Sequence, residues 1–103
     1  MNIHKNIWIG LAHVTNKFDN DILGDSRAAY VNILAIATSM NDYHIKAKDA
    51  IEKLGLECIE IEEIENLLER SKNYRLKNSI IYLANEVIKT GLVQFGNFHT
   101  FKK

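Results

Sequence analysis

Apolar residues dominate two segments in the first third of the chain, residues 6–15 and 29–38. In the first segment, Ile9 and Leu11 fall on one face of an extended chain and Ala12 falls on the other. Apolar side chains on both faces are typical of a strand that is covered on both sides or paired centrally in a sheet. We therefore predict two core strands here, antiparallel to each other.

The spacing of apolar residues becomes helical after Ser39. Asp42 follows Ser39 by three residues, which fits a capping box in which Asp replaces the usual Glu. One apolar stripe then runs along the predicted helix: Tyr43, Ala47, Ala50, Ile51 and Leu54. Gly55 ends this helix, and residues 56–61 return to a strand pattern. A strand, a helix and a strand within one sheet favour a right-handed crossover between parallel strands.

Helical spacing returns in the second half of the chain. A short helix is predicted from the apolar positions Ile61, Ile64, Leu67 and Leu68, with a break at residues 71–73. A longer helix follows over residues 74–90 and ends at Gly91. Residues 92–101 predict a final strand, in which Gly96 indicates a bulge or a close backbone approach.

The predicted elements follow the order β-β-α-β-α-α-β, which indicates the α+β class. We expect a two-layer sandwich in which a mixed four-stranded sheet carries its helices on one face. The length of 103 residues suits one domain, residues 1–103, with a single core. Hydrophobic residues make up 47% and charged residues 25%, as in an ordinary globular protein, so disorder is not expected.

Composition narrows the classes of function. Thirteen basic residues balance thirteen acidic ones, so the chain lacks the positive field that favours direct binding to nucleic acid. Cys58 is the one cysteine, which excludes an internal disulfide and suggests a reducing compartment. No apolar stretch approaches the roughly 20 residues that span a bilayer. We therefore expect a cytoplasmic protein without a membrane partner.

Motifs for catalysis, metals and cofactors are missing. The four histidines lack the close spacing of zinc ligands, and the glycines form no phosphate-binding loop, so we expect neither a metal nor a cofactor. His13 and His99 lie on predicted strands and could meet beside Tyr30, which leaves a small acid–base site open as an alternative. The simpler interpretation is two half-buried packing histidines, because no third catalytic member is evident.

Charge is distributed unevenly along the chain. Seven glutamates lie between residues 52 and 69 against the single Lys53, and four cations follow between residues 70 and 77. Asp19, Asp21 and Asp25 form a second acidic group. The plain interpretation is a solvated surface with weak ion pairs. The functional interpretation is an acidic surface that steers a basic partner and raises the association rate.

Three stretches carry a family resemblance: Trp8-Ile-Gly-Leu-Ala-His-Val14, Leu23-Gly-Asp-Ser-Arg-Ala-Ala-Tyr-Val-Asn-Ile-Leu-Ala-Ile-Ala37 and Gly91-Leu-Val-Gln-Phe-Gly-Asn-Phe-His-Thr-Phe101. In these 33 of 103 residues the chain resembles small bacterial immunity proteins of contact-dependent growth inhibition and related polymorphic-toxin systems. The resemblance implies a protein, not an enzyme, that binds the toxic C-terminal domain of a cognate effector and covers its active site.

Toxins of these systems are often nucleases with basic clefts, so an acidic patch on the inhibitor would imitate phosphate charge. The candidate toxin-binding residues are Asp19, Asp21, Asp25, Glu60, Glu62, Glu63 and Glu65. Two alternatives stay open. One is a small enzyme that acts on RNA or nucleotides through the strand histidines His13 and His99. The other is a structural domain that forms oligomers and has no toxin partner.

Overall fold

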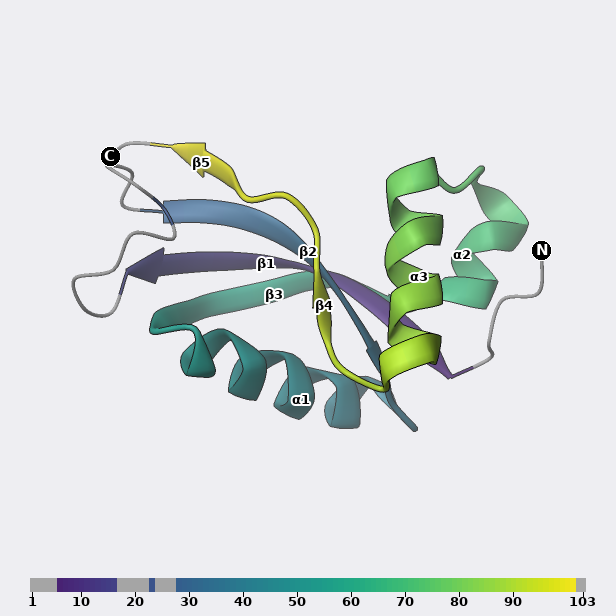
Figure 1. The fold of residues 1–103 in the computed structure, drawn as a ribbon, viewed down its shortest axis with the longest axis horizontal. Coiled ribbons are helices and arrows are strands. Elements are labelled where there is room, and N and C mark those ends of the chain that lie inside the picture. The colour runs from purple at the N-terminus through teal and green to yellow at the C-terminus, as the bar shows by residue number, and fades with distance from the viewer. Residues whose placement is uncertain (1–5, 17–22, 24–27, 102–103) are drawn as a thin grey trace.

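The structure is a computed structural model that describes residues 6–16, 23 and 28–101. In this part of the chain, three helices and five strands follow one another in the predicted order, with the last predicted strand present as two short ones (Figure 1). The elements are β1 (Ile7–Asn16), β2 (Ala28–Ile36), α1 (Met40–Lys53), β3 (Leu56–Asn66), α2 (Leu67–Asn73), α3 (Asn78–Thr90), β4 (Gln94–Phe95) and β5 (His99–Phe101). The α+β class is confirmed.

The strands form one sheet with the order β3-β1-β2-β4, and β5 also pairs with β2. Every pairing in the described sheet is antiparallel, so the prediction of a mixed sheet with four strands is wrong. The predicted strands before and after α1, β2 and β3, do run in the same direction, because each is antiparallel to β1. They are not neighbours, however, since β1 lies between them. The first strand, apolar on both faces, takes the central place that such a pattern favours.

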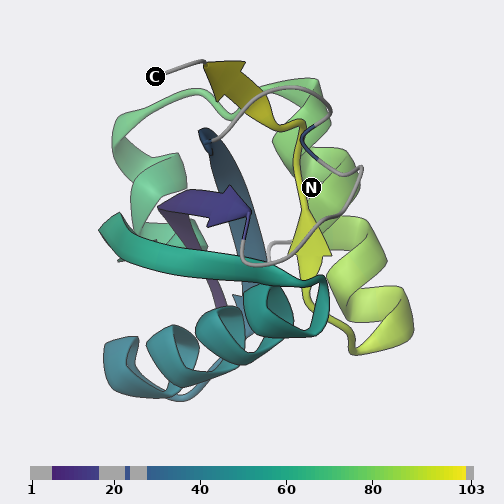
Figure 2. The same ribbon diagram turned by 90° about the vertical axis from the view of Figure 1, so that its left-hand side faces the viewer.

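Helices cover both faces of the sheet, not one face as predicted. On the first face, named the α1 face, Val31 and Ile33 pack with Tyr43 of α1 in the larger core cluster. On the second, named the α3 face, Ile9 packs with Ile80 of α3 in a second cluster that also includes Leu67 of α2. Figures 1 and 2 show α1 along one side of the sheet, and Figure 1 shows α2 and α3 at one end of it. Because strand side chains alternate between faces, apolar residues at both alternating positions require cover on both sides.

The α1 face is closed by a buried tyrosine. The Tyr43 side chain is fully buried, and its Oη donates a hydrogen bond of 2.8 Å to the carbonyl oxygen of Ile33. A Cβ atom on Gly10 would lie 2.8 Å from this Oη, which is closer than packing allows. Gly10 therefore lets the tyrosine ring lie directly against β1. Burial raises the pKa of the Tyr43 phenol well above its ordinary value of 10.0.

Two predicted helix boundaries are confirmed by their hydrogen bonds. Ser39 precedes α1, and its Oγ accepts a hydrogen bond of 3.0 Å from the backbone N–H of Asp42. Gly91 ends α3 with a φ of 71°, a left-handed conformation that costs glycine little, and its N–H donates to the carbonyl oxygen of Val87 at 2.8 Å.

The third strand is longer than predicted and ends at Asn66 instead of Ile61. Its register against β1 shifts twice, and Glu63 has a φ of 55°, as expected of a strand that contains β-bulges. An extra residue in a strand turns an alternating apolar pattern into a spacing of three. Ile61 and Ile64 therefore imitate a helix in the sequence although both lie in β3.

The second half differs from the prediction in two further places. The backbone is extended at Tyr74 and at Lys77, so α3 begins at Asn78, four residues later than expected. Near the C-terminus, the register of β4 and β5 against β2 changes around Gly96, whose N–H donates to the carbonyl oxygen of Asn32 at 2.8 Å. The predicted bulge or close approach at Gly96 is confirmed. None of the described helices is both long enough and apolar enough to cross a bilayer.

Candidate functional site

Strand register places four titratable side chains in one line across the sheet. His13 on β1 is the partner of Glu60 on β3 and of Tyr30 on β2. Tyr30 is in turn the partner of His99 on β5. Directly opposed residues project from the same face, so these four side chains form a cross-strand row on the α3 face. The described helices α2 and α3 cover a different part of this face, around Ile9.

An acidic row runs along β3, at right angles to the cross-strand row. In the described sheet β3 is an edge strand whose one neighbour is β1. The odd-numbered residues of β1 from Ile9 to Thr15 project from the α3 face, and four glutamates lie opposite them. These glutamates, the acidic row, are Glu57, Glu60, Glu62 and Glu65.

Most carboxylates of this edge make no ion pair with another described residue. Glu65 is paired with Arg70, with 2.8 Å between Oε1 and Nη1. Glu57, Glu60 and Glu62 are exposed and take part in none of the ion pairs found within the described residues. The remaining ion pairs lie within α1 and α2 at helical spacing, where such pairs add a few tenths of a kcal/mol. The negative charge of β3 is therefore directed to solvent.

The predicted toxin-binding residues fall into two groups. Asp19, Asp21 and Asp25 lie outside the described residues. Glu60, Glu62, Glu63 and Glu65 all lie on β3, which the sequence had placed partly in a helix. Three of them belong to the acidic row, while Glu63 lies at an irregular position with positive φ. The four predicted glutamates that the structure describes therefore all lie on one edge of the sheet.

The two strand histidines share a face but are separated by a tyrosine. The rings of His13 and Tyr30 are stacked, with centroids 4.8 Å apart. Since β2 lies between β1 and β5, the backbones of His13 and His99 are two strand spacings, roughly 9.6 Å, apart. Phe95 and Phe98 serve packing: both lie against the larger core cluster, with ring centroids 6.2 Å apart.

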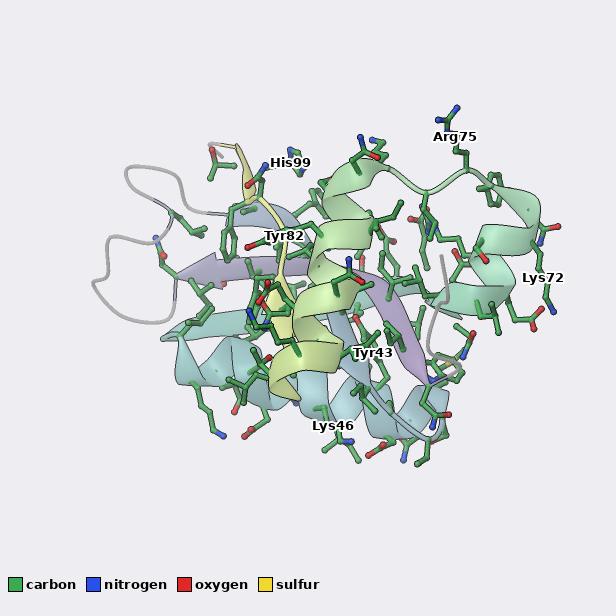
Figure 3. The ribbon with its side chains drawn as sticks, turned by 45° about the vertical axis from the view of Figure 1, so that its right-hand side comes forward. Tyr43, Lys46, Lys72, Arg75, Tyr82 and His99 are labelled. Atoms are coloured by element: carbon green, nitrogen blue, oxygen red, sulfur yellow. The ribbon has the colours of Figure 1, made fainter. Side chains whose placement is uncertain are left out.

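A cleft of about 590 Å³ lies on the α3 face beside this row. It is bounded by α3, by the segment between α2 and α3, and by β4 and β5. Its lining combines cations, tyrosines, amides and apolar side chains: Ile9, Asn32, Arg70, Tyr74, Arg75, Leu76, Lys77, Ser79, Ile80, Tyr82, Leu83, Phe95, Gly96, Asn97 and His99. Figure 3 shows Tyr82 on the side of α3 that faces β4, with His99 and Arg75 near the N-terminal end of the helix. His13 is not among the lining residues.

Neither a thiol nucleophile nor a metal centre is supported by the described residues. Cys58 is half-buried, and burial raises the pKa of its thiol, which keeps it protonated at neutral pH. Within residues 6–16, 23 and 28–101, no three His, Cys, Asp or Glu side chains are arranged to hold a metal ion.

Sequence reasoning missed the cleft. Its tyrosines Tyr74 and Tyr82 are both strongly exposed, and Tyr82 lies off the buried stripe of α3. One feature of the sequence points to the cleft, the run of cations between residues 70 and 77. By itself this run indicates only possible ion pairs with the preceding glutamates. Asn32 and Asn97, 65 residues apart in sequence, meet here only because β4 pairs with β2.

The α3 face therefore carries two exposed polar features, the acidic row on β3 and the cleft beside α3. The first is formed by one strand, whereas the second needs four separate segments of the chain. Comparison of the chain with protein-family models, with curated proteins and with solved structures finds no match in any of the three.

Proposed function

We propose that the protein is an immunity-type inhibitor whose acidic row docks onto the basic active-site cleft of a toxic effector domain. The observation that carries this proposal is the set of exposed glutamates on β3, of which Glu57, Glu60 and Glu62 have no cationic neighbour in the described structure. The family resemblance supplies the kind of partner, a toxin domain that is a nuclease. The acidic row adds a physical requirement, which is that the partner surface must be basic.

The scaffold suits such a role because the row is held rigidly. β3 pairs with the central strand β1 along most of its length, and α1 packs behind it on the other face. On a strand, alternate residues project from the same face roughly 7 Å apart, so Glu60 and Glu62 present a regular line of negative charge. A line of this kind raises the association rate with a basic cleft and orients the two proteins as they meet.

The same charges argue against the alternative of a domain that forms oligomers through this edge. An exposed edge strand offers unpaired backbone groups to any second strand. Two copies of β3 side by side would bring their glutamate rows together, and like charges directly opposite each other are destabilising. The acidic edge therefore disfavours self-association and favours a basic partner.

The molecule is also large enough for the proposed interface. The accessible surface of the chain is 6546 Å². A standard interface takes about 800 Å² from each partner, and so would use about an eighth of this surface. The acidic row and the exposed residues around it can supply such an area without any rearrangement of the core.

Charge reversal on β3 tests the proposal. The first step is to look for an exported effector encoded beside the gene, and the second is to measure the association rate between this chain and the C-terminal domain of that effector. The variant Glu60→Lys with Glu62→Lys should slow association by about tenfold or more at low salt, because the steering field is reversed. The matched control, Asp49→Lys with Glu52→Lys, makes the same change in net charge on the exposed side of α1 and should change the rate less than about twofold.

Two outcomes would contradict the proposal. The absence of any complex with that effector domain would remove the immunity role. Equal rates for the β3 variant and its α1 control would show that net charge matters while the acidic row does not. Folding of both variants is checked by circular dichroism, and neither pair of residues is buried.

A further inference from the structure

The cleft beside α3 has a chemistry opposite to that of the acidic row. Among the residues that the structure describes, its lining contains the three cations Arg70, Arg75 and Lys77 and no aspartate or glutamate. Whereas the chain as a whole is neutral, its charges are thus separated between β3 and this cleft. The first turn of α3, which begins beside the three cations, contains no acidic residue either. The potential in the cleft is therefore positive, and an anionic group would be favoured there.

Arg70 keeps donors available for such an anion. Its Nη1 donates to Oε1 of Glu65 at 2.8 Å, which anchors the guanidinium group at the edge of the cleft. A guanidinium group has five N–H donors, so one bond to Glu65 leaves others for a ligand. Arg75 and Lys77 take part in no ion pair within the described residues. In Figure 3 Arg75 extends outward from the rim, where a long and flexible side chain can turn toward a bound anion.

Aromatic and apolar side chains lie beside the cations. Tyr74 and Tyr82 line the cleft and are 66% and 59% exposed, so both rings are accessible to a ligand. The apolar side chains of Leu76, Ile80 and Leu83 continue the same wall. Exposed aromatic rings and apolar side chains together suit a flat ring, since a nucleobase stacks favourably on an aromatic side chain.

The opposite wall offers hydrogen-bonding groups. Asn32 from β2, Asn97 from the segment before β5, and His99 from β5 all line the cleft. An asparagine side chain both donates and accepts, as the edge of a nucleobase requires. The volume of about 590 Å³ lies within the range of about 300–1,000 Å³ that is usual for small-molecule sites.

We propose that this cleft binds a nucleoside phosphate. The phosphate group would be held by Arg70, Arg75 and Lys77, the base would stack on Tyr82 or Tyr74, and the amides of the opposite wall would contact the edge of the base. A single nucleotide fits better than a nucleic-acid strand, because the three cations come from one short segment, residues 70–77, and β3 carries the acidic row on the same face. This site is separate from the acidic row and does not depend on the function proposed above.

Calorimetric titration of the full chain tests the site with four probes: adenosine monophosphate, adenosine, inorganic phosphate and a short single-stranded RNA. We expect the monophosphate to bind at least about tenfold more tightly than adenosine or phosphate alone, because only it uses both the cations and the aromatic wall. The variant Arg75→Glu with Lys77→Glu should weaken the monophosphate by about tenfold or more, since charge-assisted hydrogen bonds to phosphate become repulsion.

Two further variants keep the result specific. Lys48→Glu with Lys89→Glu changes the net charge equally at exposed positions outside the cleft lining and should leave the affinity within about twofold. Tyr82→Ser removes an exposed ring and should weaken the monophosphate but not inorganic phosphate. Binding of the effector domain by the Arg75→Glu, Lys77→Glu variant should persist, so failure of this site is distinguishable from failure of the immunity role.

Three results would overturn the proposal. One is no detectable heat with the monophosphate at millimolar concentration. Another is equal weakening by the cleft variant and by its lysine control, which would indicate a general charge effect. The third is tighter binding of the RNA than of the monophosphate with a steep dependence on salt, which would identify a strand-binding surface instead.

Discussion

The two faces of the sheet are built from the same strands but differ in how much of each is covered by helices. On the α1 face, alternate residues of β1 and β2 pack under a helix, and Tyr43 fills the space above Gly10 with its hydroxyl group bonded to Ile33. On the α3 face, the described helices cover the region around Ile9, while the cross-strand row and the acidic row carry titratable side chains. The first face is closed by core packing, whereas the second presents exposed polar side chains.

The difference follows from which residues occupy alternate positions. Val31 and Ile33 project toward α1, whereas their neighbours Tyr30 and Asn32 project from the other face. A polar residue on a fully covered face would have to be desolvated at a cost of several kcal/mol unless it were paired. A half-covered face avoids that cost. The two faces should therefore respond very differently to substitution.

Removing the buried tyrosine should have the largest effect. Tyr43→Ala deletes a fully buried ring and leaves a cavity on the α1 face, so we expect the free energy of unfolding to fall by about 3–5 kcal/mol. Urea denaturation followed by circular dichroism measures this. Tyr82→Ala is the matched variant on the α3 face and should change stability by about 0.5 kcal/mol or less, because that side chain is exposed. Similar losses for the two variants would break the contrast between the faces.

Filling the space under Tyr43 should have the next largest effect. In Gly10→Ala the new Cβ would lie 2.8 Å from Tyr43 Oη and 2.9 Å from Ile61 Cγ2, so side chains must shift. We expect a loss of about 1–3 kcal/mol in the free energy of unfolding. Gly96→Ala is the control, since its nearest contact would be an ordinary 3.5 Å, and it should be close to neutral in the same urea experiment. A neutral Gly10→Ala would show that the α1 face is less tightly packed than its contacts indicate.

Alkaline pH should destabilise the α1 face specifically. Burial raises the pKa of Tyr43 in the folded protein above the 10.0 of a free tyrosine. Above pH 10 the unfolded chain loses this proton while the folded chain retains it, so stability is complete below pH 10 and falls as pH rises. The slope due to this group is about 1.4 kcal/mol per pH unit.

The variant Tyr43→Phe isolates that contribution. It lacks the ionisable hydroxyl group, so its unfolding midpoint should depend less on pH between 9 and 11.5 than that of the parent protein. At pH 7 the variant should lose about 1 kcal/mol, because the carbonyl oxygen of Ile33 loses its partner. Parallel pH profiles for the two proteins would contradict the assigned burial of the phenol.

Neutralising the acidic row should have the smallest effect on stability. Glu60→Gln with Glu62→Gln removes two exposed charges that make no ion pair in the described structure. We expect the free energy of unfolding to change by about 0.5 kcal/mol or less, and relief of repulsion along β3 can make the change favourable. A loss above about 2 kcal/mol would mean that these carboxylates hold the fold together, and would contradict their role as a docking surface.

Local patterns were sufficient to predict much of the fold. The order of the elements, the cap at Ser39 and the end of α3 at Gly91 all follow from patterns within a few residues. The antiparallel pairing of the first two strands was also predicted correctly, although it joins residues as far apart as Ile7 and Ile36. The length of β3 was not predictable in the same way. A bulge changes the phase of the side chains, so the spacing of Ile61 and Ile64 resembled a helix.

The candidate site was predicted only in part. The sequence indicated an acidic segment that contains Glu60, Glu62 and Glu65, because charge is visible residue by residue. It did not indicate that these side chains share one face of an edge strand. It also did not indicate that the cations after them line a cleft, because their position suggested only ion pairs with the glutamates. Those facts depend on register and on pairing partners far away in the chain.

The amino-acid sequence by itself determined the α+β class, the succession of helices and strands, and the separation of acidic from basic residues, because short-range propensity and periodicity act on neighbouring residues. Only the tertiary structure decided that helices cover both faces, that Glu60, His13, Tyr30 and His99 lie in one row, and that Asn32 meets Asn97 in a cleft. These arrangements come from the pairing of distant strands, whose register depends on burial of the whole core and not on any local pattern.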